Sequence, residues 1–135
     1  MADEIVLDAF ALLAFLQKEP GHQRVRSLLD DAASQQVSLS MCTVNFGEVL
    51  YWLERRQGAA AALRLATNVR QLPVQFADAD LDLTISAARI KASFPVSLAD
   101  AYAAALAQCL GAAVLTGDPD FQRLEGAVAV EWLTG

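Results

Sequence analysis

The feature that most constrains the fold is a series of short apolar runs separated by segments with helical spacing. The runs occupy residues 4–8, 37–40, 72–76, 113–116 and 128–130. They do not alternate with polar residues, which is typical of strands buried on both faces of a parallel sheet. Parallel strands need long crossover connections, and helices supply them. We therefore expect an α/β fold, with three α/β/α layers around a central parallel sheet of about five short strands.

The segments between the apolar runs are expected to form helices. They span residues 9–18, 22–35, 43–57, 59–70, 78–94, 97–110 and, as one short helix, 118–123. Thr43 is a plausible cap for the third of these helices, and Ser97 begins an S-x-x-[DE] start signal that ends at Asp100. In the fifth helix, apolar residues keep helical spacing at Leu81, Ile85, Ala88 and Ala92.

The size and charge of the chain bound its function. Residues 1–135 fit one domain, because a single hydrophobic core is comfortable at roughly 100 to 150 residues. Hydrophobic residues make up 55% of the chain and charged residues 19%, which excludes intrinsic disorder. The formal net charge is -6, so the chain as a whole repels polyanions and we expect no direct DNA binding.

The cysteines, the first residues of the chain and its longest uncharged stretch do not suggest secretion or a membrane segment. Cys42 and Cys109 lie far apart in sequence and form neither a CxxC pair nor a disulfide framework, and we expect both to be buried as small apolar residues. The first eight residues carry acids where a secretory signal would carry lysine or arginine. The uncharged stretch 101–117 is shorter than the ~20 apolar residues that a bilayer needs. We therefore expect a cytoplasmic protein without a membrane segment.

Acidic residues follow two of the expected strands at their carboxyl ends. Asp8 ends the first run, and Asp118 and Asp120 follow the run at 113–116. Asp100 lies in the first turn of the helix before that run, and its neighbours at i+3, i+4 and i+7 are alanines. Functional residues collect at the carboxyl ends of parallel strands, so these carboxylates are expected to converge. Each has a structural alternative, because an acid at these places also stabilises a helix start.

Glu48 lies in a helix that is expected to be apolar on two faces. One apolar stripe contains Phe46, Val49, Leu50 and Leu53. The neighbours of Glu48 itself are Val44, Tyr51 and Trp52. A helix that is apolar all round is largely buried, so the Glu48 carboxylate needs a partner, which is a cation, an arginine, a proton or a metal.

Four carboxylates in one apolar site repel each other strongly. Two unit charges 4 Å apart cost about 4 kcal/mol at an effective dielectric constant near 20. Lys18 and Lys91 are the only lysines, and neither is adjacent in sequence to these acids. Carboxylate oxygens without cysteine or histidine ligands suit Mg²⁺ or Mn²⁺ rather than zinc. A divalent cation is therefore the expected source of neutralising charge.

Four segments together resemble the PIN domain, and most of all the VapC ribonuclease toxins of bacterial toxin-antitoxin pairs. They are the strand that ends in Asp8, Thr43-Val-Asn-Phe-Gly-Glu48-Val-Leu, Ser97-Leu-Ala-Asp100-Ala-Tyr-Ala-Ala-Ala and Leu115-Thr-Gly-Asp118-Pro-Asp-Phe121. Their order and spacing agree with that family over essentially the whole chain. The resemblance implies a single PIN-like domain over residues 1–135, with an acidic cleft that holds Mg²⁺ or Mn²⁺.

The resemblance also implies roles for individual residues. By position, the catalytic metal ligands are Asp8, Glu48, Asp100 and Asp118, with Asp120 as an auxiliary ligand. Residues expected to support the ligands or a metal-bound water are Thr116, Ser97 and Asn45.

The implied activity is that of an endoribonuclease toxin, which hydrolyses RNA phosphodiesters with a water that the metal activates. Metal-independent RNA cleavage usually relies on an acid and base pair such as two histidines, and His22, expected at the surface, is the only histidine.

A PIN-like binding or scaffold protein without catalysis is the alternative, and the complete acidic set counts against it. A receiver domain needs a lysine that residues 115–121 lack, and a haloacid-dehalogenase-type phosphatase needs Asp-x-Asp at the first strand, where Asp8 is followed by Ala9 and Phe10.

The expected partners are RNA, a second copy of the chain and a VapB-type antitoxin. The family resemblance implies a homodimer and an antitoxin whose C-terminal segment blocks the cleft. The apolar excess independently predicts that another chain covers part of the surface. The arginines available for RNA phosphates are Arg24, Arg26, Arg55, Arg56, Arg64, Arg89 and Arg123.

Overall fold

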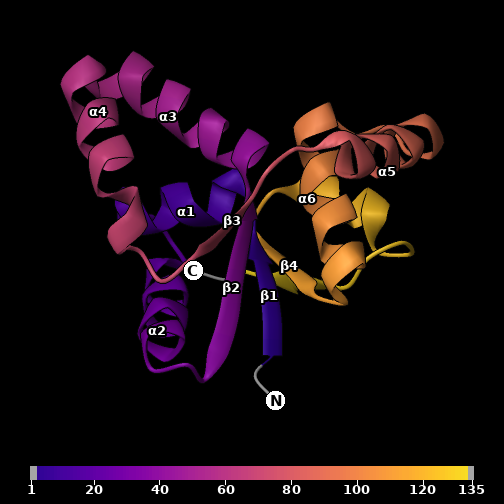
Figure 1. The fold of residues 1–135 in the computed structure, drawn as a ribbon, viewed down its shortest axis with the longest axis horizontal. Coiled ribbons are helices and arrows are strands. Elements are labelled where there is room, and N and C mark those ends of the chain that lie inside the picture. Colours follow the sequence, from indigo (N-terminus) through magenta and orange to yellow (C-terminus); the bar gives the residue numbers. More distant parts are fainter. Residues whose placement is uncertain (1–2, 134–135) are drawn as a thin grey trace.

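The central element of the computed structural model, which describes residues 3–133, is a five-stranded sheet in which every pair of neighbours is parallel (Figure 1). Its strands are β1 (Asp3–Leu7), β2 (Val37–Cys42), β3 (Gln75–Ala77), β4 (Ala113–Thr116) and β5 (Val130–Trp132). The order across the sheet is β3-β2-β1-β4-β5, so β1 is central and the chain winds outward from it in both directions. The predicted parallel sheet of about five strands is confirmed.

Helices cover both faces of the sheet, as the apolar strand pattern predicts. They are α1 (Ala9–Leu16), α2 (His22–Ala33), α3 (Thr43–Gln57), α4 (Ala59–Asn68), α5 (Leu81–Ser93) and α6 (Leu98–Leu110), with 3-10 turns η1 (Val69–Gln71) and η2 (Pro119–Leu124). Figure 1 shows α1 to α4 on one side of the sheet and α5 and α6 on the other. The three-layer α/β/α architecture is therefore confirmed.

The core is split between the two faces because successive strand side chains point to opposite sides. Val6 and Val114 face the layer that contains α5 and α6. Ile5, Leu7 and Leu115 face α1 and α2 on the other side. Alanines occupy most of the buried positions of α6, and these small side chains let the helix lie close to β1, β2 and β4.

Several boundaries differ from the sequence prediction. β3 begins at Gln75 rather than residue 72, because η1 and Pro73 keep the preceding segment out of the ladder. α5 begins at Leu81 rather than residue 78, since Asp80 caps it by accepting from the backbone N–H of Leu83 at 2.9 Å. β5 lies two residues later than expected, at Val130–Trp132.

Two local predictions are wrong. Thr43 does not cap α3, because β2 continues to Cys42 and takes that position; instead the Thr43 hydroxyl accepts from the backbone N–H of Ala79 at 3.2 Å. Cys42 is buried as expected, but Cys109 is exposed in the last turn of α6. Ser97 does cap α6, where its hydroxyl accepts from the backbone N–H of Asp100 at 3.1 Å.

Helical spacing identifies the helices but not which side of each is buried. The regularly spaced apolar residues of α5 lie outside, with Leu81 73% and Ile85 51% exposed, while Leu83 and Ile90 are buried. The prediction that α3 is largely buried on both faces is also wrong, because Tyr51 is 50% exposed. Between residues 3 and 133, no helix combines the length and hydropathy that a membrane crossing requires.

Candidate metal centre

The candidate site lies at the carboxyl edge of the three central strands. Asp8 directly follows β1, and Asp118 follows β4 after a single glycine. β2 runs straight into α3, whose first two turns contain Asn45 and Glu48. Because β2, β1 and β4 are adjacent and parallel, these segments leave the sheet at one edge. α6 packs against α3 and all three strands, which adds Asp100 from its first turn.

Asp8 is almost fully buried and is held by two hydrogen bonds. The backbone N–H of Ala11 donates to Oδ1 at 2.9 Å, so Asp8 caps α1, and the Thr116 hydroxyl donates to Oδ2. The Thr116 oxygen also accepts from the backbone N–H of Asp118 at 3.0 Å. Thr116 therefore links the acids that follow β1 and β4. The capping role of Asp8 is compatible with its place beside the other acids.

Asp100, Asp118 and Asp120 form the closest acidic group. Each offers a carboxylate oxygen, and these oxygens all lie within 4.8 Å of one another. Asp118 caps η2 by accepting from the backbone N–H of Asp120 at 2.9 Å, which holds the two side chains on one short turn. Asp120 also pairs with Arg123, whose Nη1 lies 3.3 Å from Oδ1. Asp120, predicted as an auxiliary ligand, is thus part of the closest group.

Asn45 connects α3 to α6 beside Glu48. Its Nδ2 donates to the carbonyl oxygen of Ala99 at 3.0 Å and to Glu48 Oε1 at 3.5 Å. Both of these oxygens only accept, so the amide nitrogen must face them. The Asn45 side chain is 1% exposed, and its Oδ1 is buried without a hydrogen-bond partner. A buried, unpartnered carbonyl oxygen is therefore present at the site.

The pKa values show that the acids of separate segments interact. Burial is the main cause that raises the pKa of Asp8 to about 7, and the charges of Asp100 and Asp118 add to it against the hydrogen bonds from Thr116 and Ala11. These shifts mean that the site resists carrying several negative charges at once.

The same pattern extends to the acids of α6 and α3. Burial raises the pKa of Asp100 to about 6, with further contributions from the charges of Asp118, Glu48 and Asp120. Burial also raises the pKa of Glu48, which the hydrogen bond from Asn45 partly offsets and the charge of Asp118 increases. Glu48 and Asp8 therefore lie close enough to the aspartate group to feel its charge, although neither belongs to the set within 4.8 Å.

Among the described residues, Arg123 is the only protein cation that forms an ion pair with this acidic group, and it pairs with Asp120. In the described part of the chain, ion pairs join Arg24 to Glu131 and Arg123 to Asp120, and none involves Asp8, Glu48, Asp100 or Asp118. Asp8, Glu48, Asp100 and Asp118 thus approach one another without an ion pair to a lysine or arginine.

One feature of the site was missed by sequence reasoning. A Cβ atom on Gly117, between Thr116 and Asp118, would lie 2.3 Å from a ring carbon of Phe10. With glycine here the chain leaves β4 directly against the aromatic ring at the start of α1, and a larger residue would require the half-exposed Phe10 ring to turn away. The glycine of Thr116-Gly117-Asp118 was the available signal, but its neighbour across the fold is not readable from sequence.

The donor set fits a hard divalent cation. Mg²⁺ and Mn²⁺ prefer carboxylate and carbonyl oxygens, and the site offers the carboxylates of Asp100, Asp118 and Asp120 within 4.8 Å of one another. His22, the only histidine, is the first residue of α2 and lies outside this group, and Cys42 faces the core. The site thus contains the ligand types of a magnesium or manganese centre and lacks those of a zinc centre.

Solved structures with the same fold include a toxin-antitoxin complex and a member of the VapBC family of toxin-antitoxin systems. The DNA-bound VapBC of Salmonella typhimurium matches with a TM-score of 0.74 and 18% identity, covering 98% of this chain and 99% of that chain. VapC20 of Mycobacterium tuberculosis, described as a Sarcin-Ricin loop cleaving toxin, matches with a TM-score of 0.71 and 21% identity, covering 93% and 96%. FitAcB of Neisseria gonorrhoeae matches with a TM-score of 0.68 and 20% identity, covering 93% and 95%. At these identities the likeness establishes the fold.

Sequence comparison assigns the family. A search of curated protein sequences finds no significant match. The family model of the PIN domain, however, matches residues 5–127, from β1 through the segment that carries Asp118 and Asp120. That match spans nearly the whole chain and agrees with the sheet order and the acids at its carboxyl edge. This chain therefore belongs to the PIN domain family.

Proposed function

We propose that the chain is a metal-dependent endoribonuclease and the toxin of a VapBC-type toxin-antitoxin pair that acts in the cytoplasm. The observation that carries this proposal is the convergence of Asp8, Glu48, Asp100 and Asp118 from four separate segments, without a balancing lysine or arginine among the described residues. Protein interiors rarely keep such a cluster unless a cation uses it.

In this proposal the four acids hold Mg²⁺ or Mn²⁺, and Asp120 contributes from the same aspartate group. When bound, a divalent cation activates water and offsets the negative charge of a phosphodiester. Thr116 orients the Asp8 carboxylate through its hydroxyl, and Ser97 fixes the start of the helix that carries Asp100. Asn45 orients Glu48 and keeps α3 attached to α6 through Ala99.

RNA is the proposed substrate class. The PIN family and the fold shared with VapC20, a Sarcin-Ricin loop cleaving toxin, support a nuclease that acts on RNA. The net charge of -6 does not prevent binding, because bound cations reverse the field locally and local field matters more than total charge.

The proposed partners are a VapB-type antitoxin and a second copy of the chain. Solved structures of this fold include a toxin-antitoxin complex and several VapBC proteins, which supports the antitoxin. For the homodimer, support comes from α5, where Leu81 and Ile85 project into solvent one helical turn apart and Ala88 continues the same stripe. An exposed apolar stripe of this kind is typical of a surface covered by another chain.

A cleavage assay tests the proposed function. The wild type should cleave single-stranded RNA with Mg²⁺ or Mn²⁺ and not in excess EDTA, and Asp8→Asn or Asp100→Asn should abolish cleavage. Asp82→Asn is the matched control, since Asp82 is exposed on α5 outside the site. Cleavage that survives EDTA or either site substitution would refute the proposal. A wild type that binds the metal and cleaves no RNA would instead favour a PIN-like binding protein.

A further inference from the structure

One side of α3 continues from the acidic site as a stripe of aromatic and basic residues. Its members, spaced at i, i+3, i+4, i+7 and i+8, are Glu48, Tyr51, Trp52, Arg55 and Arg56. Residues at this spacing are neighbours along one side of a helix. With a rise of about 1.5 Å per residue, the stripe leads about 12 Å away from Glu48. We call the last four of these residues the α3 track.

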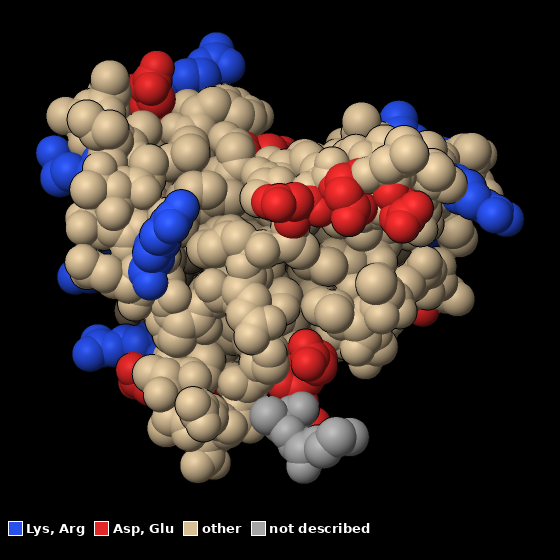
Figure 2. All heavy atoms as spheres, viewed as in Figure 1, with Lys and Arg blue, Asp and Glu red and all other residues tan. Residues whose placement is uncertain are grey.

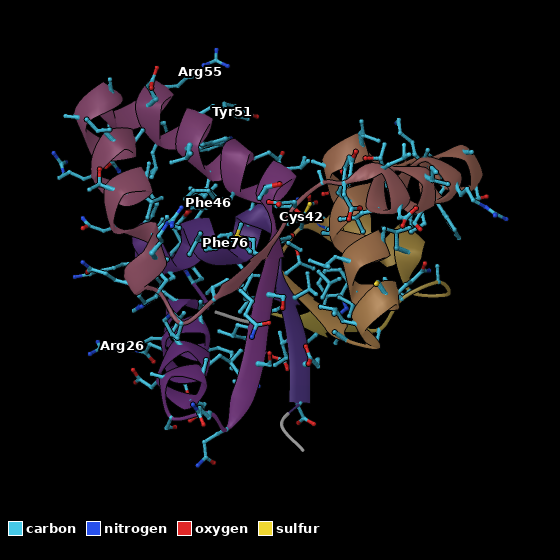
Figure 3. All side chains as sticks on the ribbon, viewed as in Figure 1. Arg26, Cys42, Phe46, Tyr51, Arg55 and Phe76 are labelled. Carbon is cyan, nitrogen blue, oxygen red and sulfur yellow. The ribbon has the colours of Figure 1, made fainter. Side chains whose placement is uncertain are left out.

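The α3 track is open to solvent and shaped around a hollow. Tyr51 is 50% exposed and Trp52 is 36% exposed, although both are large aromatic side chains. A hollow of about 250 Å³ is lined by Tyr51, Trp52, Arg55 and Arg56 alone. Figure 3 shows Tyr51 and Arg55 projecting from the outer side of α3, away from the sheet.

Neither arginine of the α3 track forms an ion pair with an acid among the described residues. The Arg56 guanidinium carbon lies 3.6 Å from the centre of the Trp52 ring, so this arginine stacks on an aromatic face rather than pairing with an acid. Among residues 3–133, the ion pairs use only Arg24 and Arg123. Figure 2 shows basic side chains with a few acids beside them around the α2 to α4 side of this view, whereas a row of acids crosses the side near α5.

This combination favours single-stranded nucleic acid over a protein partner. Aromatic rings stack on unpaired bases, and guanidinium groups bind phosphates and also stack on bases. A protein partner would need acidic groups opposite the two arginines, whereas an apolar partner surface finds a purely apolar stripe on α5, at Leu81 and Ile85. The position also fits, because the α3 track begins one helical turn after Glu48.

We propose that the α3 track is an RNA subsite that holds a single-stranded segment next to the bond to be cleaved. A base stacks on Tyr51 or, in place of the Arg56 guanidinium, on Trp52, and Arg55 and the displaced Arg56 bind neighbouring phosphates. This inference rests on the proposed nuclease function, because only a nuclease requires the bound strand to run toward the acidic site. Its test measures RNA binding and does not depend on cleavage.

The first experiment measures binding of a fluorescent single-stranded RNA by anisotropy at several salt concentrations, with all proteins carrying Asp100→Asn to suppress cleavage. Arg55→Gln/Arg56→Gln should weaken binding and lower the slope of log affinity against log salt by about 1.4, since each phosphate contact contributes about 0.7 for single strands. The control Arg26→Gln/Arg89→Gln removes the same charge from exposed positions on α2 and α5 and should leave the slope unchanged.

The second experiment tests stacking directly. Trp132→Phe leaves Trp52 as the only tryptophan of the chain. RNA should quench its fluorescence, and an abasic strand of the same length should not. Trp52→Leu should weaken RNA binding about 10-fold or more, as loss of a stacked base predicts, without changing the salt slope. Circular dichroism confirms that each variant is folded.

Three results of the RNA-binding experiments would overturn the subsite. They are an unchanged salt slope in the Arg55/Arg56 variant, an equal loss in the control, and equal quenching by the abasic strand. A variant that binds RNA normally but loses dimer or antitoxin binding would assign the α3 track to a protein partner, and so also overturn it. Failure of the nuclease proposal is distinct, because it appears as a wild type without metal-dependent cleavage.

Discussion

Replacing Asp8 by asparagine should stabilise the metal-free protein at alkaline pH. Asp8 is 3% exposed, and burial is the main cause that raises its pKa from 3.8 to about 7. Each pKa unit corresponds to about 1.4 kcal/mol, so keeping this carboxylate charged in the folded protein costs about 4 kcal/mol above pH 7. Asparagine removes the charge and retains an oxygen that accepts from the backbone N–H of Ala11, so the α1 cap is kept.

The substitution also has a local cost. The asparagine amide nitrogen takes the place of Oδ2, so the Thr116 hydroxyl loses its acceptor there. Loss of one hydrogen bond costs about 1 kcal/mol, which leaves a net stabilisation of about 3 kcal/mol for Asp8→Asn at pH 8.

The pH dependence has a definite sign because the folded-state pKa of Asp8 is raised. Below about pH 4 the carboxyl is protonated in both the folded and the unfolded chain. Between there and about pH 7 the unfolded chain loses the proton while the folded chain keeps it, so the wild type loses stability as pH rises. The advantage of Asp8→Asn should therefore shrink to about 0.5 kcal/mol at pH 5.

Urea denaturation followed by circular dichroism in EDTA, at pH 5 and pH 8, measures both free energies of unfolding. Saturating Mn²⁺ should then stabilise the wild type much more than Asp8→Asn, because only the wild type retains the full set of carboxylates. An Asp8→Asn protein that is less stable than wild type at pH 8, or a difference of equal size at both pH values, would refute the reasoning. Asp8 would then act only as a helix cap.

Three further predictions concern neighbouring features. Gly117→Ala should destabilise the fold by about 1–3 kcal/mol in thermal denaturation, because its methyl group would meet the Phe10 ring, and adding Phe10→Ala should recover much of the loss. Leu81→Asp should convert the proposed homodimer into a monomer in analytical ultracentrifugation, since that side chain is 73% exposed on the apolar stripe of α5. In Thr116→Val, Mn²⁺ affinity should begin to rise at a higher pH than in the wild type, because loss of the Thr116 hydrogen bond further raises the pKa of Asp8.

Each of these predictions has a matched control. Leu63→Asp adds the same charge at an exposed leucine of α4, 68% exposed, and should leave the dimer intact. If Leu81→Asp and Leu63→Asp behave alike, the α5 surface is not the interface. Thr116→Ser keeps the hydroxyl and should retain the wild-type pH profile. A double variant of Gly117 and Phe10 that is no more stable than Gly117→Ala alone would contradict the proposed clash.

The sheet and the acids at its edge could be predicted because they depend on local sequence patterns. Apolar runs define β1, β2 and β4, and a parallel arrangement brings their carboxyl ends together whatever the details of packing. Asp8 and Asp118 follow from that rule directly. Asp100 and Glu48 were reached from their apolar helical surroundings, which leave a charge without a sequence neighbour to balance it.

What could not be predicted depends on contacts between segments. Spacing places Leu81 and Ile85 on one side of α5, but whether that side is buried depends on how α5 packs against α6. The close approach of Gly117 to Phe10 joins β4 to α1 and leaves no local trace beyond a glycine. The sequence places Asp120 two residues after Asp118, but its closeness to Asp100 depends on the turn that Asp118 caps.

Mn²⁺ binding measured by isothermal titration calorimetry tests the central claim most directly. The wild type should bind Mn²⁺, and Asp118→Asn and Asp100→Asn should each weaken that binding by about 10-fold or more. Such a loss corresponds to about 1.4 kcal/mol or more of binding free energy from one charged ligand. The exposed control Asp82→Asn should bind as the wild type does. Wild-type affinity in Asp118→Asn, or an equal loss in Asp82→Asn, would show that these acids do not form a shared cation site.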